Sequence, residues 1–271
     1  ASRLGSGLDE RTREFGVAVE LVHCATLLHD DVVDAGDRRR GVPAARTLYG
    51  NAASIFAGDW LLVDALRRVR AAEMPDVLIR LLDIIDEMIF AEAIQLENRG
   101  RIDARLHTYM QVVEGKTAAL FRWAMFAGAR AGGLDAESCK ALEQYGLHLG
   151  VAFQLIDDHL DYAGDGSSIG KSPFTDLREG KMTHPVIVAL ESDPALRSVL
   201  EELVVSPVGE VPEAAKSQLL SALHHTGALE STRELAIRKA EDACAALDGL
   251  RDGRAREALI TVARATVHRE S

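Results

Sequence analysis

Two clusters of aspartates, far apart in the chain, have the residue types and spacing of a metal site. Both follow the pattern D-D-x-x-D at the end of an apolar helical run: Asp30, Asp31 and Asp34 in the first cluster, and Asp157, Asp158 and Asp161 in the second. Because a helix turns ~100° per residue, the first and last aspartates of each pattern lie on one face, one turn apart. Like charges at this spacing destabilise a helix unless a cation offsets them.

Carboxylates without thiols or paired imidazoles select Mg²⁺ or Mn²⁺, which bridge one or two carboxylates to substrate phosphates. One cluster alone would equally fit a solvated acidic helix end. Two copies on apolar helices, able to face each other across a bundle, favour a metal site. An EF-hand calcium loop is disfavoured because the glycine turn and terminal glutamate are missing. His29 and His159 adjoin the clusters without a ligand partner, and we expect them to pack or to support the ligands.

Basic residues follow the first cluster directly. Arg38, Arg39 and Arg40 precede Gly41, and arginine suits bidentate contacts to phosphate. A triple arginine alone is usually a solvated turn, but beside an acidic metal site it predicts a diphosphate clamp. Lysines that follow glycines could also reach phosphate oxygens, although each is a weak signal: Lys116, Lys171 and Lys181.

The composition narrows the class of partner. Lys and Arg number 31 against 42 Asp and Glu, giving a formal net charge of −11, which argues against a nucleic acid or an anionic membrane surface. No apolar run approaches the ~20 residues of a membrane span, and no leader opens the chain, so we expect a soluble protein with no integral membrane segment. The three cysteines, Cys24, Cys139 and Cys244, show no CxxC spacing and predict packed thiols in a reducing cytoplasm.

The elements that must position these residues are helices. Apolar residues recur at three- and four-residue spacings, period-two alternation is nearly absent, and the prolines fall at segment edges. We predict an all-α bundle of about ten helices, without a domain linker, as a single domain over residues 1–271. The expected helices are 9–34, 44–49, 51–73, 76–99, 105–132, 135–163, 181–191, 194–203, 212–224, 227–248 and 252–268.

These motifs, in this order from about residue 17 onward, resemble the polyprenyl synthetases, the trans-prenyltransferases that include farnesyl, geranylgeranyl and octaprenyl diphosphate synthases. The resemblance implies the isoprenoid synthase fold, one bundle around a deep central cavity, and usually a homodimer. It implies Mg²⁺-dependent head-to-tail condensation of isopentenyl diphosphate with an allylic prenyl diphosphate, with release of diphosphate. The apolar helices around 51–66 and 77–96 are where the family pairs.

The resemblance also assigns roles. It implies that the two aspartate clusters hold about three Mg²⁺ ions on the allylic diphosphate. It places Arg39 on that diphosphate, and Arg40 and His23 on isopentenyl diphosphate. The residues implied at the reacting end of the allylic substrate are Lys116, Thr117 and Gln154, and those implied on its diphosphate are Lys171 and Lys181.

The sequence departs from the family pattern in two places. Relatives carry a Gly-Gly-Lys-Arg-x-Arg-Pro stretch that binds isopentenyl diphosphate, and nothing here matches it. Either these residues are lost or a segment is missing around Gly7. In addition, Glu92 and Gln95 stand where relatives carry Gln and Asp near the metals, which leaves their role open.

The resemblance also implies that product length depends on the helix before the first cluster. Short-chain relatives carry aromatics five and four residues before the first aspartate, where this chain has Ala25 and Thr26. Small side chains at these two positions leave the cavity open where an aromatic ring would close it, which favours products of about twenty carbons or more. Candidate residues for a lower floor are Phe90, Met88 and Val22.

Two other functions stay open at this point. A terpene cyclase shares the first cluster and the helical fold, but normally replaces the second with an Asn/Asp-Ser/Thr-Glu triad. A non-catalytic subunit of a heteromeric synthase typically loses one cluster, whereas both are present here. Incorporation of radiolabelled isopentenyl diphosphate would separate the three.

Overall fold

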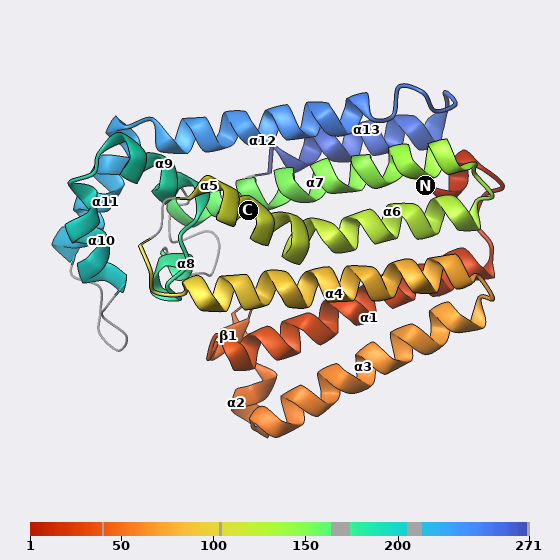
Figure 1. Cartoon of the computed structure of the whole chain (residues 1–271), viewed down its shortest axis with the longest axis horizontal. Coiled ribbons are helices and arrows are strands. Elements are labelled where there is room, and N and C mark those ends of the chain that lie inside the picture. The colour runs from red at the N-terminus through yellow and green to blue at the C-terminus, as the bar shows by residue number, and fades with distance from the viewer. Residues whose placement is uncertain (40, 103–104, 164–173, 205–212, 270–271) are drawn as a thin grey trace. The chain divides into compact units, whose positions relative to one another are not determined.

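The computed structural model describes residues 1–39, 41–102, 105–163, 174–204 and 213–269, and it is built almost entirely of helices (Figure 1). The all-α fold class predicted from the sequence is therefore confirmed. Arg40 and Lys171, both predicted to bind diphosphate, lie outside the described residues. The elements are η1 (Ser2–Leu4), α1 (Glu10–Val33), β1 (Arg38–Arg39), β2 (Val42–Pro43), α2 (Ala45–Tyr49), α3 (Asn51–Ala71), α4 (Pro75–Asn98), α5 (Leu106–Val112), η2 (Val113–Ala118), α6 (Ala119–Ala131), α7 (Ala136–Ala163), α8 (Thr175–Arg178), α9 (His184–Ser192), α10 (Leu196–Val204), α11 (Glu213–His225), α12 (Ala228–Ala245) and α13 (Arg254–Thr266).

The chain divides into two compact units. Unit 1 comprises residues 1–86, 120–146 and 246–258, and unit 2 comprises residues 87–119, 147–245 and 259–271. The long helices α4 and α7 each contribute to both units. The first aspartate cluster belongs to unit 1 and the second belongs to unit 2.

In unit 1, α1 buries one stripe of its surface. Its buried apolar residues recur at three- and four-residue steps: Phe15, Ala18, Val22 and Ala25. The ring of Phe15 meets the Trp123 ring edge-on at a centroid distance of 6.0 Å, and the Trp123 indole N–H donates to the carbonyl of Val77 at 3.0 Å. These contacts join α1 to α6 and α4.

Cys24 lies off this stripe and is exposed, so the prediction of a packed thiol is wrong for this cysteine, although all three cysteines are free.

In unit 2, helices α8 to α12 surround an apolar cluster that supports the segment after the second aspartate cluster. Phe174 and Leu177, at the start and middle of that segment, are buried in it, and the Phe174 ring meets Tyr162 edge-on at 5.6 Å. Burial of this many apolar side chains fixes where the following residues lie. A second cluster packs Tyr109 and Val113 against Leu155 and Ile156 of α7.

The structure differs from the predicted elements in three details. The predicted helix 105–132 is interrupted by η2, a π-helical turn, and the sequence did not predict the β1–β2 hairpin or α8. The hairpin strands have two residues each, and α8 has four, so neither is long enough to produce a detectable period. None of the described helices has both the length and the apolar character to cross a membrane.

Helices α6 and α7 approach closely at Gly146, which generates a test of the packing in unit 1. A Cβ atom there would lie 2.7 Å from the carbonyl oxygen of Phe121 and 2.9 Å from the backbone of Arg122, and backbone cannot move aside locally. We expect Gly146→Ala to lower the free energy of unfolding by about 1–3 kcal/mol, measured by thermal or urea denaturation. Gly16 in α1 has nothing within 4 Å of such an atom, so Gly16→Ala should be neutral or stabilising by up to about 1 kcal/mol. Equal melting temperatures for the two variants would contradict this packing.

Candidate functional site

The first aspartate cluster stands at the C-terminal end of α1. Asp30 and Asp31 lie in the last turn, and Asp34 caps the helix by donating its backbone N–H to the carbonyl of Asp30 at 2.8 Å. The C-terminal end of a helix carries partial negative charge, so three carboxylates there are electrostatically unfavourable without a cation. The position of the cluster therefore selects for positive partners.

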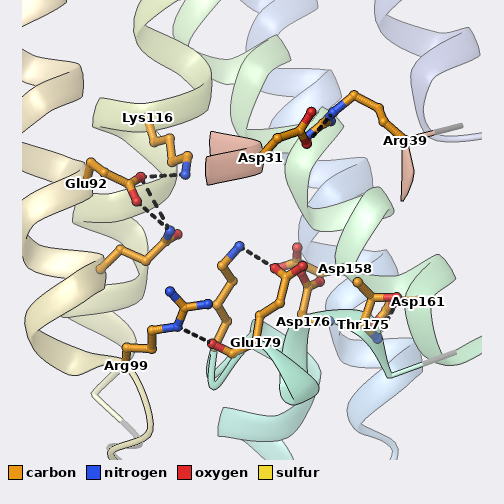
Figure 2. A network of polar contacts seen from close by, with 12 residues as sticks. Asp31, Arg39, Glu92, Arg99, Lys116, Asp158, Asp161, Thr175, Asp176 and Glu179 are labelled. Atoms are coloured by element: carbon orange, nitrogen blue, oxygen red, sulfur yellow. Dashed lines mark hydrogen bonds and ion pairs between the residues drawn. The ribbon is translucent and has the colours of Figure 1, made fainter. Parts of the chain in front are cut away.

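Arg39 supplies one such partner to Asp31. The Asp31 residue is only 4% exposed, and its Oδ1 accepts from Arg39 Nε at 2.9 Å and lies 2.7 Å from Arg39 Nη2 (Figure 2). The β1–β2 hairpin, in which Arg39 pairs with Val42, brings this guanidinium back to the helix end. The charge of the buried Asp31 carboxylate is thus compensated by Arg39, the arginine that the family resemblance places on the allylic diphosphate.

Arg46, which the sequence analysis did not single out, holds the turn between α1 and the hairpin. Its Nε donates to the carbonyl of Gly36 at 2.8 Å, and its Nη2 donates to the carbonyl of Ala35 at 2.6 Å and to Asp37 Oδ1 at 2.7 Å. Ala35 has a left-handed φ of 53°, so the turn is strained and needs this support. No spacing rule predicts such a contact across the chain.

The second cluster occupies the last turns of α7, again at a helix C-terminus. The Asp157 side chain is 42% exposed, and its Oδ1 lies 3.4 Å from Arg269 Nη2. The Arg269 guanidinium also donates to the carbonyl of Phe153 at 3.0 Å and lies 4.1 Å from the centre of the Phe153 ring. Burial lowers the pKa of Arg269, and the Asp157 carboxylate opposes that shift.

Asp158 is buried and held from two sides. Tyr109 donates its hydroxyl to Asp158 Oδ2 at 2.6 Å, and Gln154 donates its amide to Asp158 Oδ1 at 2.8 Å. Burial raises the pKa of Asp158 to about 6, while the hydrogen bonds from Tyr109 and Gln154 act in the opposite direction. The amide oxygen of Gln154 in turn accepts from the Thr117 hydroxyl at 2.8 Å.

Asp176 is a further carboxylate of this site that sequence reasoning missed. It lies in α8, and its backbone N–H and that of Thr175 donate to the Asp161 carboxylate at 3.4 and 3.3 Å. Burial raises the pKa of Asp176 well above its usual range, Asp158 and Asp161 add to the shift, and Lys181 opposes it. Sequence reasoning missed Asp176 because the contact between α8 and the second cluster arises only when the chain folds and follows no spacing pattern along the sequence.

The segment after α8 is fixed to the end of α4. Lys181 Nζ lies 2.6 Å from Glu179 Oε2. Arg99 Nε donates to the carbonyl of Glu179 at 2.9 Å (Figure 2). The backbone N–H of Gly100 donates to the carbonyl of Gly180 at 2.9 Å, and a side chain at Gly180, whose φ is 76°, would meet that N–H at 2.8 Å. These contacts place Lys181 on the same side of unit 2 as Asp176.

The π-helical turn η2 carries two more predicted residues. Lys116 Nζ lies 2.5 Å from Glu92 Oε2 on α4, and Gln95 Nε2 lies 3.4 Å from both oxygens of Glu92 (Figure 2). Gly115 permits this approach, because a Cβ there would lie 2.8 Å from the Cβ of Ala91. Glu92 therefore acts as the counter-ion of Lys116 in the free protein, which gives it a role that the sequence left open.

The predicted site residues fall into two groups. In unit 1 the structure brings Arg39 to the first cluster, and His23 lies two turns before Asp30 along α1. In unit 2 hydrogen bonds link Thr117, Gln154 and Asp158. That the two clusters face each other across the bundle stays a prediction.

The prediction that Phe90 closes the cavity further from the aspartates is wrong for the single chain. Phe90 is 65% exposed, so in the single chain it lies at the surface and not in the interior. Its neighbour Ala91 is buried, which shows that the interior face of α4 passes through position 91. Val22 and Ala25, by contrast, are buried on α1.

The donor set fits Mg²⁺ shared with a ligand. Within the described residues, no three carboxylate, imidazole or thiol groups converge closely enough to hold a metal ion by themselves. Mg²⁺ in proteins usually keeps several waters and takes only one or two carboxylates, with substrate phosphates completing its shell. Each cluster, at the negative end of its own helix, offers oxygen donors of this kind.

The sequence and the fold of this chain are both similar to those of known proteins. Residues 3–220 match the family model described as "Polyprenyl synthetase". The octaprenyl diphosphate synthase of Escherichia coli is 38% identical over 261 residues, covering 93% of this chain and 77% of that protein. A polyprenyl synthase from Caulobacter crescentus, solved with calcium and isoprenyl diphosphate, superimposes with a TM-score of 0.91 at 35% identity over 100% of this chain and 82% of that one. A decaprenyl diphosphate synthase from Rhodobacter capsulatus gives a TM-score of 0.91 at 34% identity, over 100% and 83% of the two chains.

Proposed function

The chain belongs to the polyprenyl synthetase family, and from that premise we propose that its two aspartate clusters together bind the diphosphate of an allylic substrate through about three Mg²⁺ ions. The protein is a Mg²⁺-dependent trans-prenyltransferase that condenses isopentenyl diphosphate with an allylic prenyl diphosphate and releases diphosphate. The observation that supports the site is the presence of both D-D-x-x-D clusters, each at a negative helix end with a cation beside it.

Basic residues that hold ion pairs in the free protein are the proposed diphosphate ligands. Mg²⁺ bound at the clusters would neutralise charge on the diphosphate and make it a better leaving group. Arg39 and Lys181 each hold an ion pair within their own unit, and both can exchange that carboxylate for a phosphate oxygen. Lys116 can do the same by leaving Glu92. We propose the same role for Lys171, and contacts to isopentenyl diphosphate for Arg40 and His23.

The reaction itself needs no protein nucleophile. The allylic C–O bond breaks and its electron pair leaves with the diphosphate, the alkene of isopentenyl diphosphate forms the new C–C bond, and a proton is lost to the departing diphosphate. We propose that Thr117 and Gln154, whose hydroxyl and amide dipoles are fixed against each other at 2.8 Å, line the reacting end of the allylic substrate. Fixed dipoles lower the energy of developing charge without reorganising during the reaction.

Both clusters should be required for turnover. We expect Asp30→Ala and Asp157→Ala each to lower kcat by roughly a hundredfold or more, because each removes a carboxylate from the metal-binding set. The measurement is incorporation of radiolabelled isopentenyl diphosphate, with EDTA abolishing activity and Mg²⁺ restoring it. Asp242→Ala is the control, since Asp242 is an exposed helical carboxylate 3.3 Å from Lys239. A cluster variant that keeps more than a tenth of wild-type turnover would refute the assignment.

A second copy of this chain is the proposed partner for the apolar outer face of α3. Phe56 is 71% exposed and Trp60 is 64% exposed, one turn apart, and Val63 continues the stripe. Ile79 and Leu82 form a similar exposed pair on α4. Contiguous exposed apolar surface of this kind is characteristic of an interface, and homo-oligomers usually pair identical patches.

The dimer has a direct test. Light scattering of the wild-type protein at micromolar concentration should give twice the chain mass, and Trp60→Glu should give a monomer because a charge cannot be buried unpaired in the interface. Leu8→Glu, which changes an exposed leucine outside the stripe, should remain dimeric. A monomeric wild-type protein would overturn the proposal.

Product length is the last part of the proposed function. Ala25 and Val22 are buried side chains of α1, and Thr26 uses its hydroxyl to bond the carbonyl of His23 at 2.8 Å. We propose that the small side chains of Ala25 and Thr26 let the product grow past the first cluster to about twenty carbons or more.

Substituting the small residue should shorten the product. With farnesyl diphosphate and excess isopentenyl diphosphate, we expect Ala25→Phe to shift the dephosphorylated alcohols, separated by chromatography, to shorter chains. Cys24→Phe adds the same ring on the exposed side of α1 and should leave the distribution unchanged. If Ala25→Phe keeps its melting temperature and still makes the wild-type products, the cavity does not pass that position.

A further inference from the structure

We infer that Tyr109 is a positioning residue, whose hydroxyl fixes the Asp158 carboxylate and so determines which oxygens of the second cluster are presented to a metal ion. The inference rests on the proposed function, because it concerns the Mg²⁺ site of that reaction. It separates the three aspartates of the second cluster into different roles. Figure 2 shows Asp158 and Asp161 near one another, with Asp176 from α8 beside them.

The carboxylate of Asp158 already accepts hydrogen bonds from three protein donors. Its Oδ2 accepts the Tyr109 hydroxyl at 2.6 Å and its Oδ1 accepts the Gln154 amide at 2.8 Å. The backbone N–H of His184 is a third donor to the same carboxylate. Asp158 is also only 2% exposed, so a hydrated metal ion has little access to it. The Asp158 carboxylate therefore fixes the position of the cluster through its protein hydrogen bonds.

Asp157 is the contrasting case. Its side chain is 42% exposed, and its partner, the Arg269 guanidinium, lies 3.4 Å away, which is at the limit of a hydrogen bond. Asp161 follows Asp157 by four residues and therefore shares its face of α7. Asp157 and Asp161 can thus present oxygens to Mg²⁺, while Asp158 sets the orientation of the helix end that carries them.

Tyr109 is itself rigidly placed. It is 8% exposed in the cluster with Val113, Leu155 and Ile156, and its ring lies 5.8 Å from the imidazole of His184. Its hydroxyl must be the donor, because an ionised carboxylate can only accept. A phenylalanine would keep this packing and remove only the hydroxyl.

The effect of Tyr109 reaches beyond Asp158. Because Gln154 directs its NH₂ group to the carboxylate, its amide oxygen faces Thr117, from which it accepts at 2.8 Å. The four side chains form one directed series, with donors entering Asp158 from Tyr109 on one side and from Gln154 on the other. Tyr109 therefore helps fix the amide that faces the reacting end of the substrate.

The test compares two buried tyrosines of unit 2. Tyr109→Phe should weaken Mn²⁺ binding, followed by electron paramagnetic resonance of the free ion, and raise the Mg²⁺ concentration for half-maximal rate by roughly 10–100-fold, as loss of a supporting hydrogen bond does at metal sites. Tyr162→Phe removes a hydroxyl that is equally buried but bonds Thr183 at 3.3 Å. It should lower the melting temperature by a similar amount and leave metal binding within about twofold of wild type. Equal metal binding in both variants would overturn the inference.

A double-mutant cycle shows whether Tyr109 acts through Asp158. In the Asp158→Asn background, Tyr109→Phe should have no further effect on Mn²⁺ binding, because the carboxylate that it positions is gone. A further loss of about tenfold or more would mean that Tyr109 acts by another route, and the inference would fail. Failure of the proposed function is recognised separately, since a wild-type protein that binds Mn²⁺ but does not incorporate isopentenyl diphosphate leaves the Tyr109 result intact.

Discussion

The structure is governed by the concentration of carboxylates at the C-terminal ends of two long helices. The helix end already carries partial negative charge, and each added carboxylate there costs about 0.3–1 kcal/mol. The chain offsets this cost with short elements that return a positive or donor group to the helix end. The β1–β2 hairpin brings Arg39 to Asp31, and the C-terminal segment brings Arg269 to Asp157.

The same arrangement would suit the binding of an anionic ligand with metal ions that we propose. Arg39, Lys116 and Lys181 are each held by a carboxylate at 2.5 to 2.7 Å. An ion pair of this kind limits the conformations of a long side chain before a ligand arrives, so less entropy is lost on binding. Exchange of a carboxylate for a phosphate oxygen also keeps the charge of each cation satisfied.

The sequence predicted the fold class and most helices, because helical period is a local property, while the metal-binding role of the aspartate clusters stays a prediction. It missed Tyr109, Asp176 and Arg46, whose contacts depend on how α5, α8 and α2 pack. It also placed Phe90 in the interior, since periodicity distinguishes apolar from polar faces but does not distinguish a cavity wall from an outer face. The interruption of a long helix by η2 likewise leaves no trace in the apolar pattern.

The π-helical turn has an evolutionary consequence. A π turn holds one residue more than the α-helical turn it replaces, and it forms weaker backbone hydrogen bonds. Within it, Lys116 meets α4 while the next residue, Thr117, meets α7. Loss of one residue from Val113–Ala118 would restore a regular helix and remove one side-chain position from the turn that directs Lys116 to α4 and Thr117 to α7. Single-residue deletions in this stretch should therefore be rare among active descendants of this chain, even where they improve the local helix.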